Sequence, residues 1–250
     1  MQNGKTVTTG LVLRVTETKE ADKILTVLTP DMGKIPLIAR GARRKNSRIA
    51  AASQLLAYSE LTLYKRGNWH MLDEASTLEL FDGVRQDIVL LSLASYFAEA
   101  AEAVCAEETT SPEILSLLLN ALYALCYLHK EPRLVKAAFQ FRLMALAGFE
   151  PLASGCAVCG REEPEAPMLD VVHGVVHCGG CKRSGGLSMP LTAAGLAALR
   201  HVLYCDSRRL YGFTLEPEAL RELDHAGEAF IAGQLERSFR TLDYYKSLLI

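Results

Sequence analysis

The stretch GKIPLIARGARRKNSR, residues 33–48, joins an apolar, strand-like run to a dense cluster of positive charges. It contains six cationic side chains and no carboxylate: Lys34, Arg40, Arg43, Arg44, Lys45 and Arg48. A hydrophobic core has no place for such a run, so we expect it to face water or an anionic partner, of which a phosphate backbone is the commonest. A solvated, flexible loop is the alternative interpretation.

Further short β-like runs lie on both sides of this stretch. Together the five runs are residues 6–18, 23–29, 34–40, 58–66 and 69–80. The first alternates as a half-buried strand, with Leu11, Leu13 and Val15 on one face. Five short strands with a long third connection predict a small closed barrel of the OB-fold type, with an SH3-like barrel as the alternative.

After residue 80 the pattern changes from strand-like to helix-like. Apolar residues recur at helical spacing in the segments 84–105, 112–125, 133–147, 192–204 and 217–239. The predicted fold class is therefore α+β, in four parts. These are the predicted barrel at 1–80, an α-helical domain at 81–150, a segment at 151–190 that contains four cysteines, and C-terminal helices at 191–250 that pack on the helical domain.

The net charge of −2 hides an uneven distribution along the chain. Residues 1–80 carry 12 Lys and Arg against 8 Asp and Glu, whereas residues 81–150 carry 5 against 9. A positive N-terminal part on an acidic remainder favours a nucleic-acid-binding module over a uniform enzyme surface. No apolar run is long enough for a membrane span or a signal peptide, which predicts a cytoplasmic protein without a membrane partner.

Four of the seven cysteines form two C-x-x-C pairs separated by eighteen residues: Cys156, Cys159, Cys178 and Cys181. Each pair can direct both sulfurs at one ion, and the intervening segment can fold back as a hairpin. The pattern predicts one zinc ion with four thiolates and no open position, which makes the site structural. Thiols without an ion, or a redox pair, are the alternative, and His173 and His177 are weaker candidates to replace one sulfur.

Aromatic and cationic residues alternate again near the fourth and fifth strands. Tyr58, Tyr64 and Trp69, with Lys65 and Arg66 between them, suit a surface on which unpaired bases stack. Ordinary packing of Trp69 in the barrel is an equal alternative. We therefore add Tyr64, Lys65, Arg66 and Trp69 to the six cations of residues 33–48 as candidate DNA-binding residues.

The sequence contains no motif for a catalytic site. Phosphate-binding and dinucleotide-binding glycine patterns, the H-E-x-x-H zinc-protease motif and the zinc-deaminase signature are all missing from it. This favours a protein that is not an enzyme.

Two segments resemble the RecO family of bacterial recombination mediators. They are GLVLRVTETKEADKILTVLTPDMGKIPLIARGARRKNSR, in the N-terminal barrel, and FRLMALAGFEPLASGCAVCG with HCGGC, where the family passes from helices to its zinc segment. The resemblance extends over about residues 8–205 in the same order. HGVVHC departs from the glycine-rich residues more usual before the second knuckle, and the last forty residues carry little family signal.

The resemblance implies that residues 1–80 are an OB-fold nucleic-acid-binding domain and that residues 151–190 are a four-cysteine zinc-finger insertion in the helical domain. It also implies a non-enzymatic protein of recombinational DNA repair in the RecFOR pathway. Such proteins bind single- and double-stranded DNA, anneal complementary strands, and act with RecR, and in some cases RecF, to load RecA on DNA coated by single-stranded DNA-binding protein. They also bind the acidic, apolar tail of that coating protein in the helical domain, where Arg133, Lys136 and Arg142 are the candidates here. A surface helix with scattered charges is the alternative for these three.

Two hypotheses from other classes remain open at this stage. One is a zinc-ribbon enzyme that processes nucleic acid, and the other is a zinc-stabilised adaptor that does not anneal strands.

Overall fold

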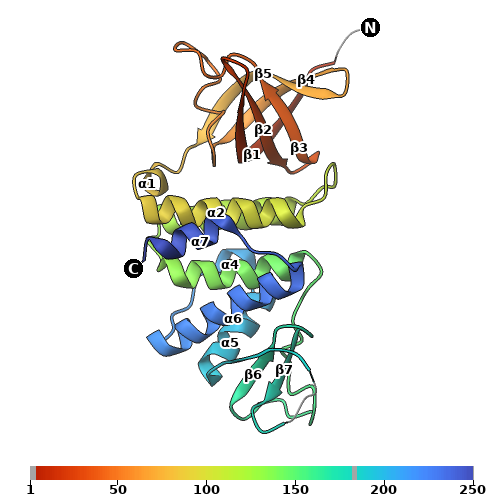
Figure 1. Cartoon of the computed structure of the whole chain (residues 1–250), viewed down its shortest axis with the longest axis vertical. Helices are drawn as coiled ribbons and strands as arrows, with labels where there is room; N and C mark the ends of the chain where they lie inside the picture. Colours follow the sequence, from red (N-terminus) through yellow and green to blue (C-terminus); the bar gives the residue numbers. More distant parts are fainter. Residues whose placement is uncertain (1–3, 182–184, 250) are drawn as a thin grey trace. The chain divides into compact units, whose positions relative to one another are not determined.

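Figure 1 shows the computed structural model of the chain, which describes residues 4–181 and 185–249. These residues form two compact units. One unit contains the chain up to Leu122 together with the C-terminal segment from Phe239, and the other is Tyr123–Ser238. The domain boundaries at residues 80, 150 and 190 remain predictions.

The first unit begins with a closed barrel of five strands, drawn in red to orange in Figure 1. The strands are β1 (Thr6–Thr18), β2 (Asp22–Thr29), β3 (Gly33–Ala39), β4 (Tyr58–Arg66) and β5 (Trp69–Glu79). Their order is β1-β2-β3-β5-β4, and β1 closes the barrel on β4. Within the barrel, β3 and β5 pair in parallel. The predicted OB-fold barrel is confirmed.

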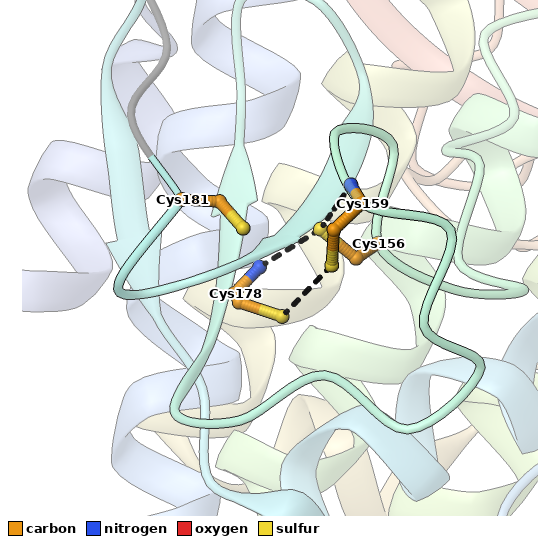
Figure 2. Close-up of side chains that lie close together, drawn as sticks. All are labelled: Cys156, Cys159, Cys178 and Cys181. Atoms are coloured by element: carbon orange, nitrogen blue, oxygen red, sulfur yellow. Dashed lines mark hydrogen bonds between the residues drawn. The ribbon is translucent and has the colours of Figure 1, made fainter.

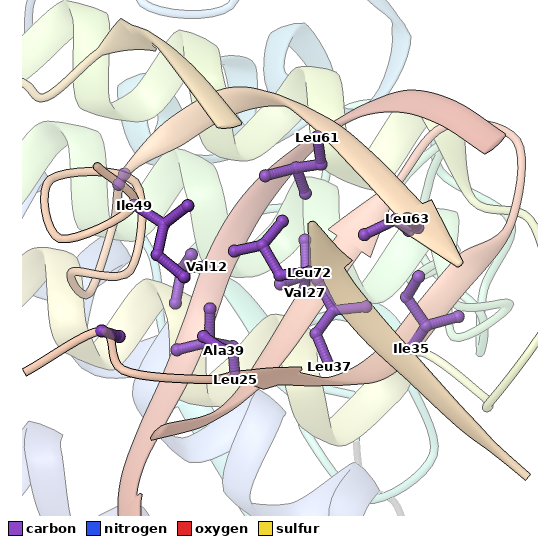
Figure 3. Packing of buried hydrophobic residues seen from close by; sticks show 12 residues of the cluster. Val12, Leu25, Val27, Ile35, Leu37, Ala39, Ile49, Leu61, Leu63 and Leu72 are labelled. Carbon is purple, nitrogen blue, oxygen red and sulfur yellow. The ribbon is translucent and has the colours of Figure 1, made fainter. Parts of the chain in front are cut away.

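Aliphatic side chains from all five strands and from the β3–β4 connection fill the barrel (Figure 3). They are Val12, Leu25, Val27, Ile35, Leu37, Ala39, Ala42, Ile49, Ala57, Leu61, Leu63 and Leu72. Along β2 and β3 these residues alternate with outward-facing ones, as a pleated strand requires. The core therefore fixes which side chains of β3 point away from the barrel.

The half-buried alternation predicted for β1 is wrong. The β1–β2 register shifts between Val12 and Arg14, which makes Leu13 an extra residue in a β-bulge. Val15 consequently packs on the same inner cluster as Val12, and not on the face of Leu11 and Leu13. Leu11 and Leu13 are nonetheless 0% and 3% exposed, because helix α2 (Ile88–Val104) packs on β1 from outside.

Residues 40–57, which connect β3 to β4, form a compact succession of turns. Backbone hydrogen bonds such as Ser47 N–H to Arg44 C=O, 3.0 Å, and Ser53 N–H to Ile49 C=O, 3.1 Å, close these turns. The side chains of Ala42, Ile49, Ala52 and Leu56 are buried beneath them. These four buried side chains thus anchor the connection to the barrel and leave its cations at the surface.

Helices complete the first unit. They are α1 (Asp82–Arg85), α2, the start of α3 (Pro112–Cys126) and α7 (Arg240–Ser247). The Asp87 carboxylate caps α2 by accepting the Val89 and Leu90 backbone N–H groups. The C-terminal segment returns to α2, where Phe239 lies edge-on to Tyr96 at 5.4 Å and Thr241 donates to the Glu99 carboxylate.

In its described residues, the second unit combines the end of α3 and three further helices with a small sheet. The helices are α4 (Pro132–Leu146), α5 (Ala193–Tyr204) and α6 (Pro217–Leu235), with a 3-10 turn at Ser207–Arg209. The strands are β6 (Pro167–Asp170), β7 (Val175–Cys178) and β8 (Ser188–Pro190), in the order β7-β6-β8. Phe141 of α4 stacks on Phe230 of α6 at 5.8 Å. No helix in the described part of the chain is long and apolar enough to cross a membrane.

Candidate metal centre and nucleic-acid interface

The two C-x-x-C pairs meet at one point of the second unit (Figure 2). The four Sγ atoms all lie within 4.8 Å of one another, and those of Cys159 and Cys178 are 3.8 Å apart. A tetrahedral ion with metal–sulfur bonds of about 2.3 Å separates its ligands by roughly 3.8 Å. The donor set and its spacing therefore fit one tetrahedral metal ion.

Backbone N–H groups stabilise negative charge on the first sulfur of the cluster. The amides of Val158, Cys159 and Cys178 point at Cys156 Sγ from 3.4, 3.5 and 3.3 Å. Burial opposes ionisation of this thiol, but the three amides and a hydrogen bond with the Cys159 side chain together outweigh burial and lower the pKa of Cys156 to about 5. A hydrogen bond with Cys159, together with burial, raises the pKa of Cys181 to about 12. Metal binding must therefore release protons from the cluster.

Arg200 of α5 holds the loop that carries the first pair. Its Nε donates to Ala153 C=O at 2.8 Å and its Nη2 to Glu162 C=O at 2.7 Å. Its Nη1 pairs with the Glu163 carboxylate at 2.8 Å. The guanidinium thus joins the chain entering the Cys156–Cys159 knuckle to the chain leaving it. Sequence reasoning missed this residue, because it lies about forty residues beyond the knuckle and belongs to no local motif.

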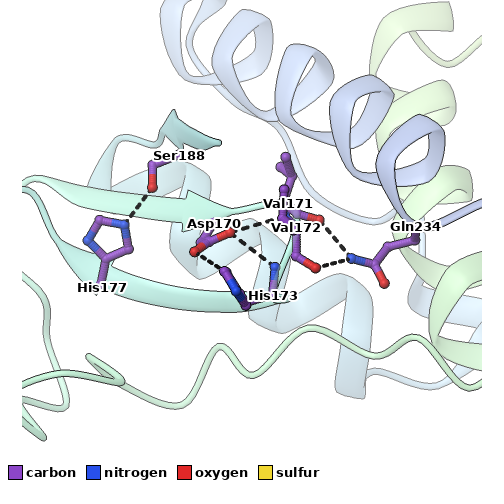
Figure 4. A network of polar contacts seen from close by, with 7 residues as sticks. All are labelled: Asp170, Val171, Val172, His173, His177, Ser188 and Gln234. Atoms are coloured by element: carbon purple, nitrogen blue, oxygen red, sulfur yellow. Dashed lines mark hydrogen bonds and ion pairs between the residues drawn. The ribbon is translucent and has the colours of Figure 1, made fainter. Parts of the chain in front are cut away.

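The two histidines near the cluster are engaged elsewhere (Figure 4). His173 Nδ1 lies 2.7 Å from the buried Asp170 carboxylate, which also accepts the His173 backbone N–H at 3.0 Å. The ring nitrogens of His177 contact Cys178 C=O at 2.9 Å and Ser188 Oγ at 2.8 Å. Both rings therefore stabilise the β6–β7 hairpin and its neighbour β8, and the four sulfurs alone form the candidate ligand set.

The basic stretch supplies an exposed set of cations on the β3–β4 connection. Arg40, Arg44, Lys45 and Arg48 are exposed, and within the described ranges no carboxylate lies at ion-pair distance from any of them. Arg43 differs, because it pairs with Glu17 at 3.1 Å and reaches Glu20 C=O at 3.4 Å. Arg43 therefore links the connection to the β1–β2 hairpin.

The remaining candidates of the barrel lie away from this set. Lys34 is half-buried and donates to Glu102 C=O near the end of α2 at 2.8 Å. It is separated from Arg40 by six residues of extended strand, roughly 20 Å. Tyr64, Lys65, Arg66 and Trp69 lie at the tip of the β4–β5 hairpin, where Trp69 is 45% exposed. Since Leu37 lies opposite His70 in the parallel β3–β5 pair, this tip is toward the Gly33 end of β3. The structure thus divides the predicted set into two groups.

The three cations assigned to a partner tail have contacts inside the second unit. Lys136 is 3% exposed and pairs with Glu228 and, at 3.1 Å, with Asp224. The Arg142 guanidinium donates to Cys205 C=O. Arg133 is 46% exposed and its Nε lies 3.7 Å from Asp224. Of the three, Arg133 offers the most surface to a partner, and the tail-binding role of all three remains a prediction.

The fold and the site define a class: a protein with an N-terminal OB-fold barrel and a helical part that carries four cysteines able to hold one metal ion. Two family models match this chain, "Recombination protein O N terminal" over residues 1–81 and "Recombination protein O C terminal" over residues 85–243. The chain belongs to the RecO family of DNA repair proteins.

Curated relatives match over nearly the whole chain. The DNA repair protein RecO of Symbiobacterium thermophilum is 30% identical over 246 residues, which is 96% of each chain. That of Acetivibrio thermocellus is 28% identical over 241 residues, again 96% of each chain. The RecO protein of Heliobacterium modesticaldum is 32% identical over 246 residues, which is 96% of this chain and 88% of the relative.

Proposed function

We propose that this protein binds single- and double-stranded DNA without base specificity and anneals complementary strands. In this proposal it acts with RecR, and in some settings RecF, to help load RecA on DNA coated by single-stranded DNA-binding protein. The observation that carries the proposal is the exposed group Arg40, Arg44, Lys45 and Arg48 on an OB-fold barrel, without carboxylate partners among the described residues.

Annealing requires that two polyanions approach while their bases remain free to pair. A cationic surface lowers the phosphate repulsion, and each phosphate that it binds releases condensed counterions into the solution. Hydrogen bonds to base edges are not needed for this task and would favour particular sequences. We infer that no nucleotide hydrolysis is involved and that the protein is not an enzyme.

We further propose that the metal is one zinc ion with a structural role. Four thiolates complete a tetrahedral shell, so a bound zinc ion has no position for a water or a substrate. This argues against the zinc-ribbon enzyme as an alternative. The ion would hold the β6–β7 hairpin and the knuckle loop together through its sulfur ligands.

The acidic, apolar tail of single-stranded DNA-binding protein remains a proposed partner of the helices. Arg133 is the residue on α4 best placed to test this idea, because its side chain is 46% exposed. Lys136 would have to leave Asp224 and Glu228 before it could reach a partner. We expect Arg133→Ala to weaken binding of the isolated tail peptide, measured by fluorescence anisotropy. Equal affinities of wild type and variant would remove Arg133 from the proposal.

The first test compares two triple charge reversals in annealing and binding assays without nucleotide. R44E/K45E/R48E reverses unpaired cations of the connection, whereas R208E/R209E/R221E makes the same type of change at exposed arginines of the second unit. We expect the first variant to anneal poorly and to bind oligonucleotides of any sequence with a flatter salt dependence. The slope should fall by about 0.7 to 0.9 for each phosphate that the variant no longer binds.

The control variant should anneal and bind like wild type. If R44E/K45E/R48E bound DNA with wild-type affinity and salt slope at low ionic strength, the proposed DNA-binding surface would be wrong. If it bound weakly but annealed normally, this surface would have no role in annealing. An adaptor without annealing activity predicts that the wild-type protein leaves the rate of strand pairing unchanged.

A further inference from the structure

Beside the basic connection the barrel has an open polar cleft of about 540 Å³. Its lining residues come from two places in the sequence. Lys19 and Asp22 belong to the β1–β2 hairpin, and Arg40, Gly41 and Arg44 belong to the start of the β3–β4 connection. Lys19 lies outside the basic stretch, and nothing in the sequence pattern associates it with Arg40 and Arg44.

Hydrogen bonds fix the two walls of the cleft to each other. Gly41 N–H donates to Asp22 Oδ1 at 2.8 Å, and Arg43 N–H donates to Ala21 C=O at 3.0 Å. Gly41 has φ +66°, and a Cβ at this position would lie 3.3 Å from Cδ of Arg44. The glycine therefore both allows the turn and lets the Arg44 side chain lie close over the backbone. The cations are presented by a pre-organised turn.

The charges in the cleft are unbalanced. Lys19, Arg40 and Arg44 supply three positive charges, and Asp22 supplies one negative charge. For the residues with described positions, none of the three cations has a carboxylate within ion-pair distance. The Asp22 carboxylate accepts the Gly41 N–H through Oδ1, and this hydrogen bond holds the two walls of the cleft together. The lining residues therefore carry an excess of two positive charges, which a bound anion such as a phosphate group would offset.

We propose that this cleft seats a phosphodiester group of a nucleic-acid strand, with Lys19, Arg40 and Arg44 as its ligands and Asp22 as a positioning residue. The inference rests on the proposed DNA binding and specifies where one phosphate of the strand lies. Arginine gives directional, paired N–H donors to phosphate oxygens, and lysine adds a flexible point charge. The hairpin turn thus takes part in binding together with the connection.

The discriminating variant is Lys19→Gln, because Lys19 is absent from the triple charge reversal that tests DNA binding as such. We expect K19Q to bind a single-stranded oligonucleotide more weakly and to flatten the plot of log affinity against log salt by about 0.7, the value for one bound phosphate of a single strand. K19R should restore the slope. Lys5→Gln, an equal charge change on an exposed lysine paired with Asp73, should leave the slope unchanged.

NMR of the Arg40 and Arg44 Nε–H signals distinguishes a phosphate of a nucleic-acid strand from free inorganic phosphate. An oligonucleotide should shift both signals in wild type, whereas a fully methylphosphonate-linked oligonucleotide, which has no backbone charge, should shift neither. Inorganic phosphate that shifted both signals at the same concentration as the oligonucleotide would make the cleft a free-anion site and overturn the inference.

Failure of this inference is distinguishable from failure of the proposed function. If K19Q kept the wild-type slope while R44E/K45E/R48E bound DNA poorly, the phosphate seat would be wrong and DNA binding by the connection would stand. If the triple variant bound normally, DNA binding by the connection would fail whatever K19Q did. Circular dichroism of K19Q and K19R checks that both are folded.

Discussion

At the scale of single residues, the buried group around Lys136 has the clearest physical consequence. Lys136 of α4 and Asp224 of α6 are 3% and 4% exposed, and their charged atoms are 3.1 Å apart. Burial raises the pKa of Asp224 to about 6, although the Lys136 charge acts in the opposite direction. The folded protein therefore retains a proton on Asp224 over a pH range in which an unfolded aspartate has already lost it.

The difference between the folded and unfolded pKa of Asp224 predicts that ionisation of this carboxyl lowers the stability of the folded protein as the pH rises. Because the folded-state pKa is above the unfolded value, the favourable contribution is complete below about pH 4 and is lost through about pH 6. We expect wild type to lose about 2 to 3 kcal/mol of unfolding free energy relative to Asp224→Asn between about pH 4 and pH 7. Denaturant unfolding of both proteins across this range measures it. Asp206→Asn, at an exposed carboxylate, is the control, and parallel pH profiles for wild type and D224N would contradict the prediction.

At the scale of the elements, helix α5 and the first metal knuckle act together through Arg200. The guanidinium bonds to Ala153 C=O, Glu162 C=O and the Glu163 carboxylate. Groups that hydrogen-bond directly to metal-ligating side chains commonly contribute a factor of about 10 to 100 in metal affinity. Arg200 instead holds the backbone on both sides of the ligating loop, so we expect Arg200→Ala to weaken zinc binding by about tenfold, the lower end of this range, in a competition titration with a chromophoric chelator.

Two variants sharpen the Arg200 experiment. Arg200→Lys should recover only part of the affinity, because one ammonium group cannot reproduce the directions of the guanidinium bonds. Arg208→Ala, at an exposed arginine in the 3-10 turn that follows α5, controls for loss of charge. Equal zinc affinities for R200A and wild type would show that the knuckle holds its shape without α5.

At the scale of the whole molecule, the two compact units should differ in their response to metal removal. The four cysteine side chains bring the knuckle loop and β7 together, whereas the barrel core consists of aliphatic side chains from β1–β5 and the β3–β4 connection. We expect chelation to raise amide hydrogen exchange in β6 and β7 roughly tenfold or more and to leave β2 and β3 protected. Cys156→Ser/Cys178→Ser should behave like the chelated protein. Unchanged exchange in β6 and β7, or elemental analysis without zinc, would refute the structural-zinc proposal.

The strands and the four-cysteine cluster could be predicted from the sequence because their signals are local. The β-rich runs and their turns indicated the barrel, and two C-x-x-C pairs bring their sulfurs to one ion through short chain geometry. The bulge at Leu13 was missed, since an extra residue in β1 is recognisable only against the register of β2. In addition, helix α2 packs on the outer face of β1, so both faces of this strand are apolar and the polar–apolar alternation of a half-exposed strand is absent.

The sequence by itself determined that this protein has a cationic N-terminal barrel, a helical remainder and a sulfur cluster. Only the tertiary structure decided which cations are available to a partner. Arg43 is paired with Glu17, Lys34 is held at the end of α2, and Lys136 is buried with Asp224 and Glu228. It also brought Lys19 beside Arg40 and Arg44. The physical reason is that the availability of a charge depends on neighbours in space, and these neighbours are far apart in the chain.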